Sequence, residues 1–123
     1  MAVTWIKKSE EKGSATFSNS YVVINQLFAD KFSNSFSALL GMDEQKNIIF
    51  KPLSLDEAES PKYKDSVLLK VNIFNSFVRL GNTANMKVIS ELLELDLGKS
   101  GVKFETVWSE KENALVVETG GGK

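Results

Sequence analysis

The fold is decided by an eight-residue stretch that occurs twice, as FSNSYVVI at residues 17–24 and as IFNSFVRL at residues 73–80. Both copies follow one pattern (apolar, any, Asn, Ser, aromatic, Val, any, aliphatic), and the second begins 56 residues after the first. Asn-Ser between two apolar runs favours a tight turn, because Asn tolerates a positive φ. Apolar and polar positions alternate on both sides of this turn, which is typical of strands. Each copy therefore predicts a β-hairpin.

A helix is expected after each hairpin. In the second copy, apolar residues recur at helical spacing over residues 84–95, with Asn82 or Thr83 as the N-cap. Gly98 lies just beyond this segment, where glycine commonly ends a helix. In the first copy, the smaller apolar face of residues 26–33 predicts a shorter helix.

A second hairpin is expected after each helix. Its strands are predicted at residues 36–43 and 47–53 in the first copy, and at residues 102–109 and 114–119 in the second. The offset between matched positions is now 66 instead of 56, so the second copy has ten extra residues in its helix and the following loop. The sequence therefore predicts an α+β fold built from two tandem β-β-α-β-β units.

The two units are expected to form one domain. The expected layout is a single domain, 1–123, with repeat 1 at about 14–53, a linker at about 54–66, repeat 2 at about 67–119 and a flexible C-terminal tail at 120–123. Within the linker, Ser54 and Glu57 have the spacing of a capping box, which predicts one helical turn before Pro61. Residues 3–8 are expected to add an edge strand, with residues 9–13 as its turn.

The composition is that of an ordinary globular domain, with 42% hydrophobic and 25% charged residues and a net charge of −1. The chain has no cysteine and no histidine, which excludes disulfides, thiolate chemistry and histidine-based catalysis. We therefore expect a protein that is not an enzyme and that uses no cofactor or metal. The sequence contains no signal-peptide pattern and no stretch of membrane-spanning length, so a cytoplasmic location is expected.

Three polar motifs have both a chemical and a simpler interpretation. Gly98-Lys99-Ser100 resembles the end of a phosphate-binding loop, but a helix precedes it where such a loop needs a strand, so we expect a helix end and a turn. The acidic residues at 43–44 and 110–112 fall in predicted hairpin turns, where solvated carboxylates are expected. Arg79 lies on a predicted strand and either faces solvent as a simple polar residue or contacts a phosphate or a partner carboxylate.

The order of hairpin, helix and hairpin resembles the swapped-hairpin proteins of the AbrB/SpoVT/MraZ group, above all members with two copies on one chain, such as MraZ and small prokaryotic proteins of the same layout. The resemblance is carried by NSFVRL at residues 75–80, LLELDL at 92–97, IIFKP at 48–52 and ALVV at 114–117. It implies that the two units interleave their hairpins into one pseudo-two-fold β-barrel. It also implies a DNA-binding transcriptional regulator that uses basic residues of its first hairpins.

Two functional hypotheses follow. One is a prokaryotic DNA-binding regulator of the AbrB-like type, whose partner is double-stranded DNA. The alternative is a non-enzymatic protein-interaction or assembly module that keeps the fold without the DNA-binding surface, favoured by the near-neutral charge, the single arginine and open edge strands. Neither involves a membrane, and the chain is expected to be a monomer, as an intrachain pseudo-dimer, or a homodimer. The candidate DNA or partner contacts are one tryptophan and five basic residues: Trp5, Lys7, Lys8, Lys12, Lys70 and Arg79.

Overall fold

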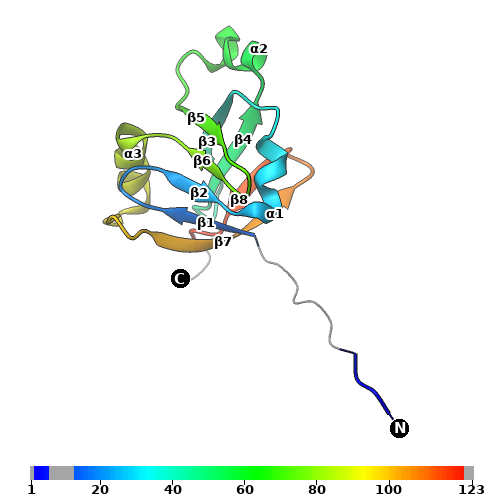
Figure 1. The fold of residues 1–123 in the computed structure, drawn as a ribbon. Coiled ribbons are helices and arrows are strands. Elements are labelled where there is room, and N and C mark those ends of the chain that lie inside the picture. The colour runs from blue at the N-terminus through cyan, green and yellow to red at the C-terminus, as the bar shows by residue number, and fades with distance from the viewer. Residues whose placement is uncertain (1, 6–12, 121–123) are drawn as a thin grey trace.

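The computed structural model describes residues 2–5 and 13–120. Eight strands close into an antiparallel barrel in the order β1-β2-β6-β5-β3-β4-β8-β7 (Figure 1). The strands are β1 (Ser14–Phe17), β2 (Val22–Ile24), β3 (Ser37–Met42), β4 (Ile48–Leu53), β5 (Leu68–Ile73), β6 (Val78–Leu80), β7 (Val102–Ser109) and β8 (Ala114–Val117). The helices are α1 (Gln26–Ala29), α2 (Leu55–Ala58) and α3 (Thr83–Leu93), with 3-10 turns η1 (Asp30–Phe32) and η2 (Pro61–Tyr63). The prediction of a β-barrel with few helices is confirmed.

Both predicted Asn-Ser hairpins are present. β1 pairs with β2 around the turn at residues 18–21, and β5 pairs with β6 around the turn at residues 74–77. In each turn the amide of the first residue donates a 3.0 Å hydrogen bond to the carbonyl of the fourth. The second hairpins, β3–β4 and β7–β8, also form at the predicted places. The repeated sequence pattern thus produces the same local structure twice.

Strand pairing between the two halves of the chain follows the same repeat. β2 pairs with β6 so that Val23 lies opposite Arg79, and these two residues are equivalent positions of the repeat. β4 pairs with β8. This register is also unchanged when each residue is replaced by its equivalent in the other copy, 66 positions away. β3 pairs with β5, and β7 pairs with β1. The strand order is therefore the same when β1–β4 exchange places with β5–β8.

The interior of the barrel is the hydrophobic core. Phe17 and Phe50 are fully buried and meet edge to face, with ring centroids 6.1 Å apart. Helices α1 and α3 lie on opposite sides of the barrel in Figure 1, and α3 adds Met86 and Ile89 to the core while η1 adds Phe32. Burial of each such side chain stabilises the fold by about 1.5–3 kcal/mol.

The helices begin within one residue of the predicted positions, but α1 and α3 end earlier. The helix predicted at residues 26–33 stops at Ala29 and continues as the 3-10 turn η1. Asn82 caps α3 by accepting a 2.9 Å hydrogen bond from the Asn85 amide, and Ser54 with Glu57 forms the predicted capping box of α2. The prediction that Gly98 lies at the end of α3 is wrong. Glu94 ends the helix instead, because it takes the left-handed conformation (φ 52°) that usually falls to glycine.

The predicted N-terminal edge strand is wrong where the structure can be compared with it. Residues 2–5 are in no strand and extend away from the barrel (Figure 1), and residues 6–12 lie outside the described residues. The reason is topological, since β1 is already paired on both sides, with β2 and with β7. For the same reason the barrel, as far as the chain is described, has no open edge strand, which removes that argument for an interaction module.

The last described residue is tied to the barrel. The Gly120 amide donates a 2.9 Å hydrogen bond to the side-chain oxygen of Asn47, in the turn between β3 and β4. Of the tail that was predicted to be flexible, residues 121–123 lie outside the described residues.

Candidate functional site

Acidic residues are absent from two segments that meet in the barrel. Residues 13–25 and 66–90 contain no Asp or Glu, although the chain has sixteen acidic residues. These segments supply β1, β2, β6 and β5, which are consecutive neighbours in the barrel, and the first eight residues of α3. We call the four strands the acid-free sheet. Its charged side chains are Lys70 and Arg79, so this sheet is positively charged in a chain whose net charge is −1.

Arg79 lies at the centre of the outer face of the acid-free sheet. Its neighbours Val78 and Leu80 are fully buried, and side chains alternate along a strand, so Arg79 points outward. Val23 of β2 lies opposite it on one side, and Asn72 of β5 lies opposite it on the other. Arg79 is therefore flanked across the sheet by uncharged side chains.

Two more cations lie near Arg79, Lys70 on this outer face and Lys103 on the neighbouring strand β7. Lys70 is exposed and lies on β5, two residues before Asn72. Because Asn72 is opposite Arg79, Lys70 is the diagonal neighbour of Arg79, at about 7–8 Å between backbones. Lys103 of β7 lies opposite Thr16 of β1, three strands away from Arg79, or about 14 Å at the usual strand spacing. The outer face of the acid-free sheet therefore carries Lys70 and Arg79, and Lys103 lies just beyond its edge on a strand that also carries Glu105.

The Arg79 side chain is held by aromatic rings. Its Cζ lies 4.2 Å from the ring centroid of Tyr21 and 5.0 Å from that of Phe74. Phe74 in turn stacks on Phe77, with centroids 4.7 Å apart and planes 12° apart. The Arg79 Nε is buried and has no hydrogen-bond partner among the described residues. The ring contacts hold the guanidinium without using its N–H donors.

Among the predicted contact residues, the structure brings Lys70 and Arg79 together. Trp5 is 82% exposed, on a segment that extends away from the barrel (Figure 1). The other three predicted contacts (Lys7, Lys8 and Lys12) lie outside the described residues.

Sequence reasoning missed the aromatic rings around Arg79. For Phe77 a signal was available, because it is two residues before Arg79 and therefore on the same side of the strand. For Tyr21 there was none, because its contact depends on the pairing of β2 with β6.

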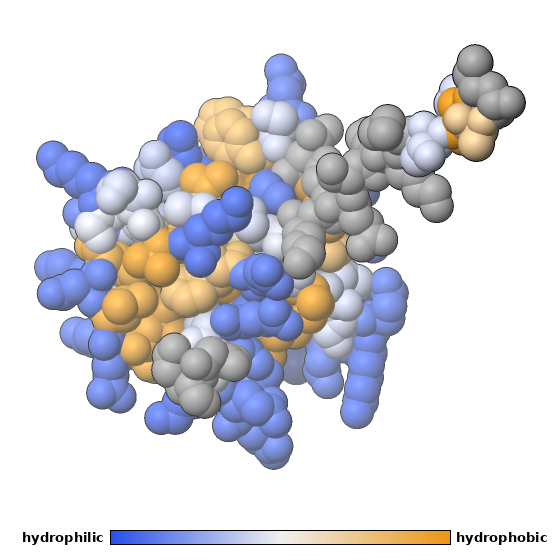
Figure 2. All heavy atoms as spheres, turned by 90° about the horizontal axis from the view of Figure 1, so that it is seen from below, coloured by the Kyte–Doolittle hydropathy of each residue, from blue (hydrophilic) through white to orange (hydrophobic). Residues whose placement is uncertain are grey.

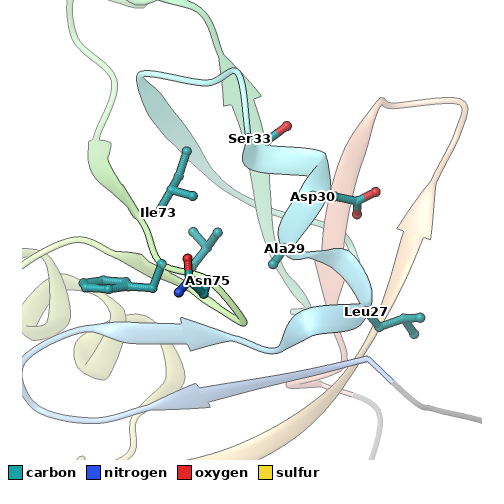
Figure 3. Close-up of a pocket in the computed structure, with 8 residues that line it drawn as sticks. Leu27, Ala29, Asp30, Ser33, Ile73 and Asn75 are labelled. Atoms are coloured by element: carbon teal, nitrogen blue, oxygen red, sulfur yellow. The ribbon is translucent and has the colours of Figure 1, made fainter.

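A shallow depression lies beside the aromatic rings, between the β5–β6 turn and the α1–η1 segment. Its volume is about 550 Å³. Figure 3 shows Ala29 facing Ile73 and Asn75, while Leu27 and Asp30 point away from them. Its lining includes one titratable residue, Asp30, so it offers no pair of groups for acid–base chemistry.

Asp43 has a structural role in the turn between β3 and β4. In the β3–β4 turn, Asp43 accepts hydrogen bonds from the Gln45 amide at 2.9 Å and from the Asn47 amide and side chain at 2.9 and 3.1 Å. Desolvation raises the pKa of the Asp43 carboxyl, but these hydrogen bonds outweigh it and hold the pKa below its usual value. Within the described residues, no cluster of three or more acidic side chains is placed to bind a metal ion. No helix there has the length and apolar character to cross a membrane.

Comparison of the chain with protein-family models, with curated proteins and with solved structures gave no match. A functional assignment therefore depends on the geometry of the acid-free sheet and its surroundings.

Proposed function

We propose that the chain is a small DNA-binding protein of the AbrB-like, tandem swapped-hairpin type, which regulates transcription and contacts duplex DNA through the acid-free sheet. The observation that carries the proposal is Arg79, whose guanidinium lies over the rings of Tyr21 and Phe74 at the centre of a sheet without carboxylates. DNA presents a dense row of phosphates, and a surface without acidic side chains avoids repulsion from them.

The strand pairing supports the swapped-hairpin part of the proposal. Within each unit, the first and second hairpins do not pair with each other in the described barrel. Instead, β3 of the first unit pairs with β5 of the second, and β7 of the second pairs with β1 of the first. Each unit thus completes its sheet with a hairpin from the other.

The charges predict weak and salt-sensitive binding. If Lys70, Arg79 and Lys103 each meet one phosphate, the logarithm of the affinity falls with the logarithm of salt concentration with a slope near −2.7, at about −0.9 for each contact. Arg79 adds geometry to charge, because a fixed guanidinium presents parallel donors that match a phosphate or a guanine edge.

Fluorescence anisotropy with a labelled mixed-sequence duplex, over a salt series that starts at about 50 mM, tests the proposal. We expect measurable binding at the lowest salt, and a slope about 0.9 less steep for Arg79→Gln. Lys111→Gln is the matched control, because Lys111 is an exposed cation in the turn between β7 and β8, off the acid-free sheet. Absence of binding by the wild type at the lowest salt, or equal losses in the two variants, would contradict the proposal.

Exposed apolar side chains favour the alternative of a protein-interaction or assembly module. Ile73, Phe74 and Leu27 surround the depression beside α1 and are 50%, 42% and 38% exposed. A further face, seen from below in Figure 2, also has apolar atoms between hydrophilic side chains. Such surfaces are typical of protein contacts when they are contiguous.

Light scattering over a concentration series tests this alternative as self-assembly. We expect a mass above that of the monomer for the wild type and a monomer for Ile73→Ser, with the exposed Val107→Ser on β7 as the control. A wild-type protein that stays monomeric throughout would count against assembly through this surface.

A further inference from the structure

We propose that a cleft at one end of the acid-free sheet binds one backbone phosphate of the DNA. The cleft lies between the β1–β2 turn, α3 and the loop that precedes β7. The inference rests on the proposed function, since it extends the same surface, and it adds Lys87 and Lys99 as contacts.

The cleft is basic and has no acidic wall. It is lined by residues 18–21, Thr83, Lys87 and Lys99, and its volume is about 570 Å³. Two ammonium groups and the hydroxyl of Thr83 are the donors that a phosphate group accepts from. Ser18 is not among them, because its Oγ donates to the Tyr21 carbonyl and accepts from two amides within the turn.

The loop that carries Lys99 is fastened on both sides of this residue. On one side, the Asn19 amide donates a 3.1 Å hydrogen bond to the Gly98 carbonyl. On the other side, Gly101 has φ +83°, and a Cβ there would lie 2.8 Å from Cγ2 of Thr16, so only glycine fits against β1. These two contacts join residues 79 and 85 positions apart in the sequence, and they hold Lys99 over the β1–β2 turn.

Lys87 is positioned by a helix that the core fixes. Met86 and Ile89 are buried, which sets the rotation of α3. Thr83 and Lys87 are four residues apart, so they share one helix face over the cleft. The neighbouring depression also includes Lys87 but is lined by Glu91 and Asp96. Because carboxylates repel an anion there, a phosphate reaches Lys87 from the side of the acid-free sheet.

The cleft and Arg79 are joined through one side chain. Tyr21 lines the cleft, and its ring centroid lies 4.2 Å from Cζ of Arg79. A charged path therefore runs from Arg79 past Tyr21 to Lys87 and Lys99. This continuity favours a polymer of phosphates, such as a DNA backbone, over a single small anion.

The test combines two probes on the double variant Lys87→Gln/Lys99→Gln. Inorganic phosphate, followed by ¹H–¹⁵N NMR, is expected to shift the amides of residues 18–21 and 83–87 in the wild type and not in the variant. With the mixed-sequence duplex, the variant is expected to bind roughly tenfold more weakly at about 50 mM salt, with a slope about 0.9 less steep. Lys62→Gln/Lys64→Gln, which removes two exposed cations of the linker, is the control for charge alone.

The outcomes separate this inference from the proposed function. Duplex binding that depends on Arg79 but is unchanged in the double variant would overturn the phosphate site and leave the DNA proposal standing. Localised phosphate shifts without any duplex binding would overturn the DNA proposal and the assignment of the bound phosphate to a DNA backbone. Equal weakening in the linker control would show that only net charge matters, and would overturn the site. Near-ultraviolet circular dichroism checks that each variant is folded.

Discussion

Replacement of Gly81 by alanine is expected to destabilise the fold, whereas the same change at Gly98 is expected to leave it intact. Gly81 joins β6 to α3 and has φ +83°, a conformation that costs a residue with a Cβ about 1–2 kcal/mol. The added Cβ would also lie 2.8 Å from Cδ2 of Leu69, which is fully buried. Gly98 is the matched control, because a Cβ there meets no atom within 4 Å and its φ is not positive.

The two penalties at Gly81 add. Overpacking of a core side chain costs about 1–3 kcal/mol, and alanine recovers about 0.4–1 kcal/mol by restricting the unfolded chain. The net loss is about 1–5 kcal/mol, a large part of the about 5–15 kcal/mol that stabilises an ordinary domain. For a chain of this size that corresponds to a fall in Tm of roughly 3–25 °C. For Gly98→Ala we expect no loss and a gain of at most about 1 kcal/mol.

Differential scanning calorimetry and urea unfolding of the two variants measure this difference directly. Similar Tm values for Gly81→Ala and Gly98→Ala would refute the reasoning, because they would mean that Gly81 has neither the left-handed conformation nor the contact with Leu69. A lower Tm for Gly98→Ala than for Gly81→Ala would refute it as well.

Three further predictions concern local structure. Asn82→Ala removes the acceptor of the Asn85 amide and is expected to lower the free energy of unfolding by about 1 kcal/mol, measured by urea titration. Because the pKa of Asp43 is lowered in the folded state, its hydrogen bonds stabilise the fold fully at pH values above the ordinary pKa of 3.8. This contribution disappears as the pH falls through the lower pKa of the folded state. In Asp43→Asn, the free energy of unfolding should therefore depend less steeply on pH in the acid range. Carboxyl titration of the wild type by NMR should give a pKa of Asp43 below 3.8. Phe50→Ala empties a fully buried site and is expected to cost about 3–5 kcal/mol in guanidinium unfolding.

The hairpins and helix starts could be predicted because their causes are local. The Asn-Ser turns, the alternation on either side and the caps at Ser54 and Asn82 all act within a few residues. The end of α3 could not be predicted in the same way. Gly98 was the expected terminator, yet Glu94 adopts the left-handed conformation at a cost that its sequence does not reveal.

Lys70 and Arg79 could be named as candidate contacts from the sequence, but their surroundings could not be predicted because these depend on strand pairing. Residues 1–64 contain eight lysines and eight acidic residues, so charge counted along the chain shows no basic region. The acid-free sheet arises only when the hairpin of β1 and β2 meets that of β5 and β6. The same closure of the barrel explains why the N-terminal strand failed, since Val3 and Trp5 have no edge to join.

The register suggests why this surface is built from one chain and not from two copies of a shorter one. Val23 and Arg79 are equivalent in the repeat and lie opposite each other, so they flank the proposed pseudo-two-fold axis. In a homodimer both positions would carry the same residue, and two arginines facing each other at about 5 Å between Cβ atoms would repel and destabilise the sheet. Two valines would leave the centre of the surface without a cation. A tandem chain avoids both outcomes, because equivalent positions of its two units can carry different residues. Arg79 can therefore face an apolar partner, stack on rings from both units and supply one unopposed positive charge at the axis.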